Sequence, residues 1–219
     1  MTGAGSTMTV VVLGGHGQIA RRLLRLLTER GHVARGVVRN PEHVAELERL
    51  GAQAVVLDLE RDELTDAVRG ADAVVFAAGA GAGSGPERKG TVDLGGAVKL
   101  IDACRAEGVA RYLMISAMGA PDPSAGSEAM RPYLEAKAEA DRRLTASGLD
   151  FTIVRPGSLT DEEGTGRIDA APSLGRRGEV TRDDVAQTLL AVLGAPNAVG
   201  KTFEVLGGQT PVAEAVAAL

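Results

Sequence analysis

Tyr133 and Lys137 have the residue types and the spacing that acid–base catalysis needs, because they stand four positions apart in the segment YLEAKAEAD. On a helix, this spacing places both side chains on one face. A nearby ammonium group stabilises a phenolate and lowers the pKa of the tyrosine, so that the phenol can exchange a proton with a carbonyl or alcohol oxygen. Short motifs of this kind also arise by chance, so the interpretation depends on their surroundings.

The segment before this pair supports a catalytic interpretation. We expect a strand over 111–115, a loop over 118–130 and a helix over 133–146. Ser116 directly follows the expected strand. Its hydroxyl either hydrogen-bonds the same substrate oxygen or belongs to an ordinary turn.

A second motif, G-x-x-G-x-x-A, is formed by Gly14, Gly17 and Ala20. It stands between an apolar run over 9–13 and a helical pattern over 19–30. Backbone N–H groups and the helix dipole can hold a pyrophosphate at such a position. The glycines allow a tight turn and a close approach of the diphosphate, and Ala20 lets the helix pack against the strand. We therefore predict a dinucleotide-binding turn, with a glycine-rich turn that binds nothing as the alternative.

The ends of the next two expected strands indicate which dinucleotide binds. An acid at the end of the second strand bonds the ribose 2′-hydroxyl of NAD, whereas an arginine accepts the 2′-phosphate of NADP. Arg39 stands there, which favours NADP(H) over NAD(H) unless this arginine is merely exposed. Asp58 and Leu59 follow the third strand and either flank the adenine or, for Asp58, bond local backbone. His16 lies inside the glycine turn, where it either touches phosphate or packs.

Short apolar runs alternate with helical patterns along the chain, as a parallel sheet with crossover helices requires. Near-continuous apolar runs indicate strands that are buried on both faces. The predicted fold class is therefore α/β, a single Rossmann-type doubly wound parallel sheet with helices on both faces. The expected strands are 9–13, 32–38, 53–57, 73–77, 111–115 and 150–154, and the expected helices are 19–30, 41–50, 91–107, 133–146 and 182–193.

Two expected loops, 79–90 and 118–130, follow strands, and open α/β sheets bind ligands at that end. We interpret 1–8 as a disordered lead and 9–219 as one nucleotide-binding domain, with a small C-terminal segment, 158–219, on the substrate side. Residues 158–178 are expected to be irregular. Thr181 is expected to cap the helix that follows.

The composition argues against several classes of protein. The chain has 219 residues and a formal net charge of -5, which opposes binding to nucleic acid or anionic lipid. The apolar stretches are too short to span a bilayer, and the N-terminus resembles no secretory signal. Cys104 is the lone cysteine, so no disulfide or cysteine metal cluster can form within the chain. We expect a cytoplasmic protein without a metal site, acting on a small molecule as a monomer or homodimer.

Further segments complete a recognisable pattern. They are GGHGQIAR (14–21), VRNP (38–41), LDL (57–59), DAVVFAAG (72–79), VDLGGAVKLIDAC (92–104), ISAMGA (115–120), YLEAKAEAD (133–141), TIVRPGSLT (152–160) and KTFEVLGG (201–208). Over nearly its whole length the chain resembles the atypical branch of the short-chain dehydrogenase/reductase family, in the group of NAD(P)-dependent epimerase-like or NmrA-like proteins.

This resemblance implies which residues bind the cofactor and which react. The catalytic set would be Ser116, Tyr133 and Lys137, with Asp93 standing where the family usually has asparagine. Lys137 would also bond the nicotinamide ribose. The residues that would hold NADP(H) are Gly14, His16, Gly17, Gln18, Ile19, Arg39, Asp58, Leu59, Ala77, Ala78, Gly79, Lys137, Pro156 and Gly157.

The expected activity is NADPH-dependent reduction of a carbonyl in a small or polycyclic substrate, with Tyr133 as the proton donor and Ser116 orienting the oxygen. Two alternatives stay open. One is an epimerase, dehydratase or isomerase that oxidises and reduces its cofactor within one turnover, and the other is a non-catalytic NADP(H)-binding redox sensor of the NmrA-like type. The low aromatic content predicts an aliphatic pocket lined by residues such as Met118, Met130 and Leu159.

Overall fold

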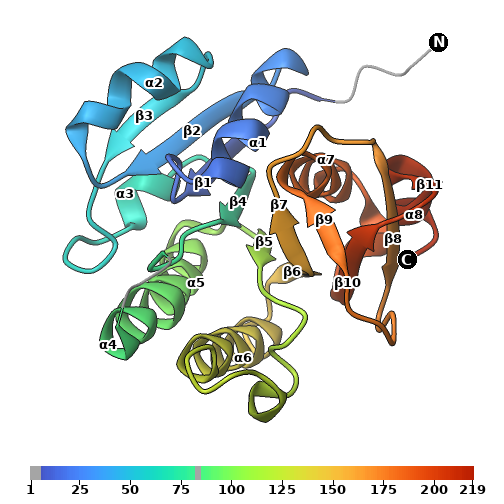
Figure 1. The fold of residues 1–219 in the computed structure, drawn as a ribbon. Helices are drawn as coiled ribbons and strands as arrows, with labels where there is room; N and C mark the ends of the chain where they lie inside the picture. Colours follow the sequence, from blue (N-terminus) through green and yellow to red (C-terminus); the bar gives the residue numbers. More distant parts are fainter. Residues whose placement is uncertain (1–5, 82–84) are drawn as a thin grey trace.

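A computed structural model of the chain describes residues 6–81 and 85–219 (Figure 1). In these residues, one sheet of nine strands has the order β11-β8-β10-β6-β5-β4-β1-β2-β3. Its strands are β1 (Thr9–Leu13), β2 (Val33–Val38), β3 (Gln53–Val56), β4 (Ala73–Phe76), β5 (Arg111–Ile115), β6 (Asp150–Pro156), β8 (Arg167–Ala171), β10 (Lys201–Gly207) and β11 (Thr210–Pro211). A separate pair is formed by β7 (Ser158–Thr160) and β9 (Glu179–Thr181).

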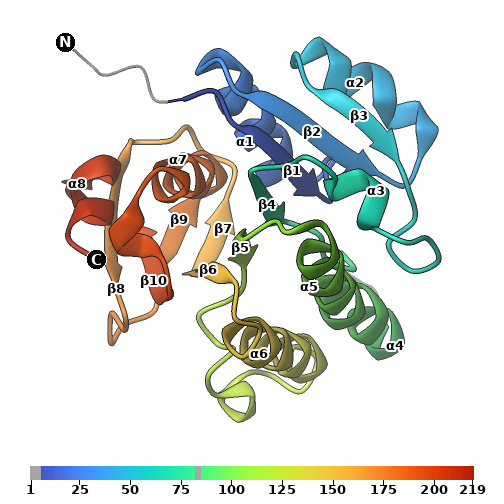
Figure 2. The ribbon, with the colours of Figure 1, turned by 180° about the vertical axis from the view of Figure 1, so that it is seen from behind.

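Helices connect the strands and cover both faces of the large sheet. They are α1 (Gln18–Glu29), α2 (Val44–Arg49), α3 (Thr65–Val68), α4 (Pro86–Arg88), α5 (Gly96–Glu107), α6 (Arg131–Thr145), α7 (Arg182–Leu193) and α8 (Val212–Ala217). Three single turns of 3-10 helix are η1 (Pro41–His43), η3 (Pro123–Ala125) and η4 (Pro196–Ala198). The segment η2 (Lys89–Gly95) is π-helical. Figures 1 and 2 show α5 and α6 on one face of the sheet, and α1 and α7 on the other.

The strand β1 shows why the apolar runs lack polar alternation. Val10 and Val12 pack in the cluster that includes α1 and α7, whereas Val11 and Leu13 pack in the cluster that includes α5. All four side chains are fully buried. Successive side chains of a strand point to opposite faces, so a strand covered on both sides must be apolar at every position.

The predicted α/β fold is confirmed. All six expected strands are present, and each pairs in parallel with its neighbours among them. The helix predicted over 41–50 is divided into η1 and α2, and the one predicted over 91–107 begins within η2 and continues as α5. Thr181 caps α7 as expected, since its hydroxyl accepts a hydrogen bond from Asp184 N over 3.0 Å.

The structure corrects three expectations. Residues 158–178 are not irregular, because β7 and β8 lie there, and β8 pairs antiparallel with β10 and β11 at the edge of the sheet. Met8 is part of the fold, since Val33 N donates to its carbonyl over 2.8 Å, while residues 1–5 of the expected lead lie outside the described residues. The expected loop 79–90 includes α4 and the start of η2, and its residues 82–84 lie outside the described residues.

The C-terminal part of the chain builds the other side of the sheet. Strand β10 pairs in parallel with β6, and α7 packs against α1 across the sheet face. The carboxyl ends of β1, β2, β4, β5 and β6 therefore share one edge, where parallel sheets bind ligands. In the part of the chain that is described, no helix combines the length and the apolar character needed to cross a bilayer.

Candidate functional site

Two cavities lie at this edge of the sheet. The first has a volume of about 370 Å³ and lies beyond the ends of β1 to β4. Nine of the residues expected to bind the cofactor line it, which are Gly14, His16, Gly17, Arg39, Asp58, Leu59, Ala77, Ala78 and Gly79. The second cavity is larger, about 1070 Å³, and lies beyond β5 and β6.

The glycine turn after β1 lies against the end of β4. Gly14 has a φ of +77°, and a Cβ atom added there would lie 2.6 Å from Ala78 Cα. A Cβ atom at Gly17 would lie 3.1 Å from the carbonyl oxygen of Gly14. Glycine is therefore required at Gly14 by backbone conformation and by contact, and the turn leaves its backbone exposed to the cavity.

The N-terminus of α1 is suited to an anion. Gly17 caps this helix without a side-chain hydrogen bond, and the first turn contains no acidic residue. The amide groups of the first turn and the helix dipole are thus left for a negatively charged ligand, as a pyrophosphate would be. Ile19 is buried in the core, so only its backbone can serve the ligand. The residues present therefore fit the diphosphate of a dinucleotide.

Arg39 lies at the far end of the first cavity and is available to a ligand. Its side chain is 58% exposed, and its ion pair with Glu60 is long, with 3.9 Å between Arg39 Nη1 and Glu60 Oε2. Glu60 has closer partners in Arg88, at 3.5 Å, and the Thr91 hydroxyl, at 2.6 Å. A ligand phosphate could replace so weak a contact.

Two residues whose roles were left open both line the first cavity and make local contacts. Asp58 Oδ1 accepts a hydrogen bond from Glu60 N over 2.9 Å, which is the turn contact expected of an aspartate. The ring of His16 stacks on His43 with 3.4 Å between ring centroids, and its Nε2 lies 2.9 Å from Glu46 Oε2. His16 is therefore held in place by the protein itself.

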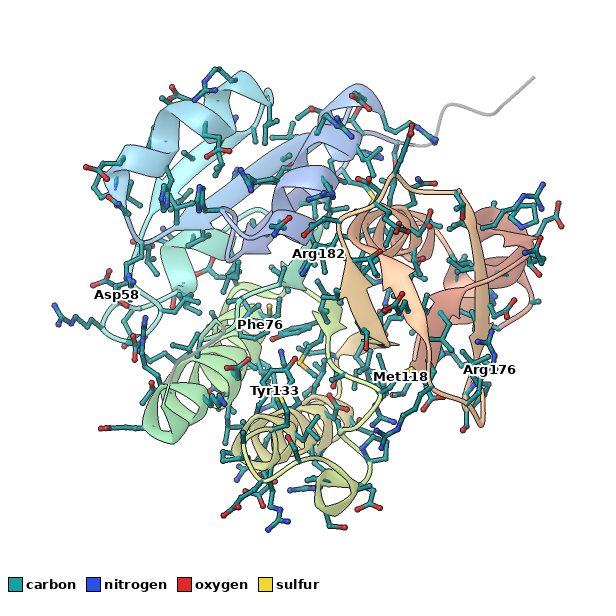
Figure 3. The ribbon with its side chains drawn as sticks, viewed as in Figure 1. Asp58, Phe76, Met118, Tyr133, Arg176 and Arg182 are labelled. Atoms are coloured by element: carbon teal, nitrogen blue, oxygen red, sulfur yellow. The ribbon has the colours of Figure 1, made fainter. Side chains whose placement is uncertain are left out.

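The second cavity is lined by two of the four expected catalytic side chains, Tyr133 and Ser116, but not by Lys137 or Asp93. Pro156 and Gly157, which were expected to help hold NADP(H), also line it. The predicted aliphatic residues also line it, and these are Met118, Met130 and Leu159. Figure 3 shows Tyr133 and Phe76 near the middle of the molecule, with Met118 between Tyr133 and Arg176 and with Asp58 on the side away from Arg176.

Two loops approach each other at the rim of the second cavity. Glu204 on β10 is buried and accepts a hydrogen bond from Leu174 N over 2.6 Å, which anchors the loop between β8 and β9. Arg177 of the same loop donates to the carbonyl of Ala125 in η3 over 3.4 Å. The rim is thus built from segments far apart in the sequence.

Lys137 does not lie free beside Tyr133. Its Nζ donates to the carbonyl of Ile115 over 2.9 Å and lies 3.4 Å from Asp93 Oδ1, and both charged side chains are buried. The expectation that Lys137 lowers the pKa of Tyr133 is not met. Burial, followed by the charges of Asp93 and Asp141, raises the pKa of Tyr133 to about 12.

A second buried ion pair, Asp141 with Arg155, was not singled out in the sequence. Arg155 donates to Asp141 Oδ2 from Nη2 over 2.8 Å and from Nε over 3.0 Å, and Arg155 lines the second cavity. Burial raises the pKa of Asp141, and the nearby Ser116 hydroxyl and Arg155 act against this shift. Asp141 stands four positions after Lys137 on the same face of α6, which is the signal that could have revealed it.

Ser116 and Asp141 are not fully satisfied by the protein. Ser116 Oγ and Asp141 Oδ1 are buried, and although the two side chains are neighbours, neither atom has a partner in full hydrogen-bonding geometry among the described residues. Buried polar atoms of this kind are rare and are explained by a ligand, a water molecule or a catalytic role. Across residues 6–81 and 85–219 there is no group of three or more His, Cys, Asp or Glu side chains that could hold a metal ion.

Known proteins are similar to this chain over almost its full length. A family model for NAD(P)H-binding proteins matches residues 14–196. The uncharacterized sugar epimerase YhfK of Bacillus subtilis is 43% identical over 212 residues, which cover 95% of this chain and 99% of that protein.

Solved structures show the same similarity. A Bacillus halodurans protein named as an NAD-dependent epimerase/dehydratase is 43% identical, with a TM-score of 0.94 over 97% of this chain and 100% of that one. The oxidoreductase YlbE of Lactococcus lactis is 30% identical, with a TM-score of 0.86 over 97% of this chain and 96% of that one. With the glycine turn and the open N-terminus of α1, these matches establish a site for a nicotinamide cofactor. The chain therefore belongs to the NAD(P)H-binding proteins of the atypical short-chain dehydrogenase/reductase family.

Proposed function

We propose that this protein is an NADPH-dependent reductase that converts a carbonyl group into an alcohol, with Tyr133 as the proton donor. The observation that carries the proposal is the setting of the Tyr133 phenol, which faces the second cavity and whose pKa burial raises to about 12. A phenol with such a pKa keeps its proton at neutral pH. It is therefore in the form that an acid catalyst of reduction needs.

The residues divide the chemistry between them. The nicotinamide, when bound, supplies the hydride that adds to the carbonyl carbon. Tyr133 transfers its phenolic proton to the carbonyl oxygen as negative charge develops there, and solvent then returns a proton to the phenolate. We assign to Ser116 a hydrogen bond to the same oxygen, because its buried hydroxyl has no partner within the described residues.

The second cavity indicates the size and polarity of the substrate. Its volume of about 1070 Å³ lies just above the range of roughly 300–1,000 Å³ that is common for small-molecule pockets. Its aliphatic side chains include Met118, Met130, Leu134 and Leu159. These features favour a substrate with a sizeable aliphatic part and a carbonyl that reaches Tyr133.

The first cavity favours NADPH over NADH. Arg39 stands at the end of β2, is largely exposed and has only a long ion pair with Glu60. A ribose 2′-phosphate offers this guanidinium charge-assisted hydrogen bonds, which a 2′-hydroxyl cannot equal.

An epimerase is the second candidate, because two proteins 43% identical to this chain carry epimerase names. Epimerisation through transient oxidation requires Tyr133 first to accept a proton from a substrate hydroxyl. The raised pKa of Tyr133 makes its phenolate scarce at neutral pH, so this first step is disfavoured. The reductase, in contrast, starts from the protonated phenol, which is the form present at neutral pH.

The test follows the absorbance of NADPH with a panel of aliphatic ketones, aldehydes and quinones. We expect turnover by the wild type, and a loss of about 10²–10⁴-fold in kcat for Tyr133→Phe with NADPH affinity unchanged. Tyr112→Phe is the matched control, because the Tyr112 hydroxyl donates to Ala97 O in the core, away from both cavities.

The other outcomes separate the alternatives. Product formed from a hydroxylated substrate without net change in the cofactor would establish the epimerase. Tight NADPH binding without turnover on any substrate would support a non-catalytic redox sensor. A Tyr133→Phe variant as active as the wild type would remove Tyr133 from the mechanism.

A further inference from the structure

Asp93 is a buried charge to which the proposed reaction gives no role. It lies on the π-helical segment η2, and its side chain is 0% exposed. Its Oδ2 accepts a hydrogen bond from Ala80 N over 3.1 Å, and its Oδ1 lies 3.4 Å from Lys137 Nζ. The carboxylate therefore connects the segment after β4 to helix α6.

Lys137 is held on two sides. Besides Asp93, it contacts the carbonyl oxygen of Ile115, to which it donates over 2.9 Å. Its Nζ lies 5.7 Å from the centroid of the Phe76 ring and 5.8 Å from that of the Tyr133 ring. A cation that is paired with a buried carboxylate contributes little net charge to stabilise a phenolate nearby.

The charges around Tyr133 favour its protonated form. Burial raises its pKa most, and the charges of Asp93 and Asp141 act in the same direction. The charged groups that act on Tyr133 or lie against its ring are Asp93 from η2 and Lys137 and Asp141 from α6. The other charged side chains that line the second cavity with it are Asp122, Arg155, Arg176, Arg177 and Glu204, of which Arg155 and Arg176 are themselves paired with carboxylates.

We propose that Asp93 is a positioning residue that offsets the charge of Lys137 and thereby keeps the Tyr133 phenol protonated to a higher pH than it would be beside an unpaired lysine. The inference rests on the role proposed above for Tyr133 as the acid of a reduction. It also explains what an acid does at this position that an asparagine cannot. Asparagine could accept the same bond from Ala80, but it would leave the charge of Lys137 free to act on Tyr133.

The decisive measurement is the ionisation of Tyr133, which needs no substrate. Tyrosine labelled with carbon-13 at Cζ reports phenol and phenolate by NMR, and the chain has two tyrosines. Tyr133→Phe identifies the signal. The other signal belongs to Tyr112, whose pKa burial raises well above its ordinary value. In the wild type the Tyr133 signal should remain that of a phenol up to roughly pH 11, since burial raises its pKa to about 12.

Asp93→Asn should bring the onset of Tyr133 ionisation down by at least about one pH unit, a tenfold increase in acidity. Asp102→Asn is the matched control, because it removes the same charge from an exposed position on α5, where Asp102 lies 3.8 Å from Arg105. The control should leave the onset unchanged. An unchanged onset in Asp93→Asn would overturn the proposal.

Asp93→Asn leaves Lys137 buried without a countercharge, which destabilises the fold. If this single variant does not fold, a second variant tests the proposal. The double variant Asp93→Asn with Lys137→Gln removes both charges. If the two charges offset each other, its Tyr133 onset should lie within about half a pH unit of the wild type. A large upward shift would show that Lys137 acts on Tyr133 uncompensated, and would overturn the proposal.

Turnover provides a separate reading. If a reducible substrate is found, its pH profile should show no loss from Tyr133 ionisation below about pH 10 in the wild type, and an earlier loss in Asp93→Asn. If no substrate is reduced, the NMR measurement still tests the proposal for Asp93, because the ionisation of Tyr133 is observed without turnover. A failure of the reductase proposal is thus distinguishable from a failure of this one.

Discussion

The two cavities differ in the groups that form them, which are mainly backbone in the first and mainly side chains in the second. The first depends on backbone: a glycine turn, the ends of strands and the uncapped N-terminus of a helix. The second depends on buried side chains, with two ion pairs, Asp93 with Lys137 and Asp141 with Arg155, behind or along its wall. Backbone recognises what all members of a cofactor class share, namely phosphate, whereas side chains can differ with each substrate.

This difference has a consequence for stability. A backbone site fails when its conformation is disturbed, even by one methyl group. A site made of buried ion pairs fails when one partner is removed, because the other is left buried and unpaired. Substitutions that remove a charge and substitutions that add a methyl group should therefore affect the two cavities differently.

Gly14→Ala should have the largest effect, and it acts on the backbone site. The φ of +77° is strained for alanine, and the new Cβ would lie 2.6 Å from Ala78 Cα. We expect the free energy of unfolding to fall by about 3 kcal/mol and NADPH affinity by about 100-fold. Chemical denaturation and calorimetric titration measure the two quantities.

Gly31→Ala is the matched control for this prediction. Its φ is +79°, yet an added Cβ would meet nothing within 4 Å. It should cost only the conformational strain, about 1 kcal/mol, and leave NADPH binding unchanged. Equal losses in the two variants would mean that close contact with β4 is unimportant.

Asp141→Asn should have the next largest effect, and it acts on the second cavity. Arg155, which is partly exposed to the cavity, would lose its countercharge, so we expect a loss of about 2 kcal/mol in unfolding free energy, with NADPH affinity kept within about twofold. Glu139→Gln on the same helix breaks more exposed ion pairs, with Arg142 and Arg143, and should cost less than about 1 kcal/mol. Denaturation curves measure the loss of stability in both variants. A large loss of NADPH affinity in Asp141→Asn would contradict the idea that the two cavities can be disturbed independently.

Arg39→Gln has the smallest expected effect on the protein and tests the one exposed arginine proposed for the backbone site. We expect the stability and the NADH affinity to be unchanged. The NADPH affinity should fall by about tenfold, which is the contribution of one charge-assisted hydrogen bond to binding. Arg61→Gln removes an exposed charge from the neighbouring segment as the control. Calorimetry with both cofactors is the measurement, and an equal loss for NADH would show that Arg39 does not read the 2′-phosphate.

The sequence predicts most of the fold and the first cavity for the same physical reason. Both depend on local patterns: apolar runs for buried strands, and glycines at fixed spacing for the turn at Gly14. The strands from β7 to β11 were not foreseen, and β8 shows why. The segment Arg167–Ala171 mixes charged and small residues, and its pairing with β10 depends on residues more than thirty positions away.

The second cavity could be predicted only in part. Tyr133 and Lys137 follow from helical spacing, but their electrostatic relation does not. It depends on Asp93, which tertiary structure brings within 3.4 Å of Lys137, and on burial, which is the main cause that raises the pKa of Tyr133 instead of lowering it. Asp141 and Arg155 are likewise joined across two elements, and each alone resembles an ordinary charged surface residue.

The order of the strands at the far edge also bears on how the chain is made. Among the described residues, strand β8 pairs with β10 and β11 alone, both of which are synthesised after it, and β10 in turn pairs with β6. On the ribosome, the first five strands can assemble while β8 still has no partner. The wall that Glu204 anchors is therefore among the last parts to form, so a nascent chain could acquire its nucleotide site well before its substrate cavity closes.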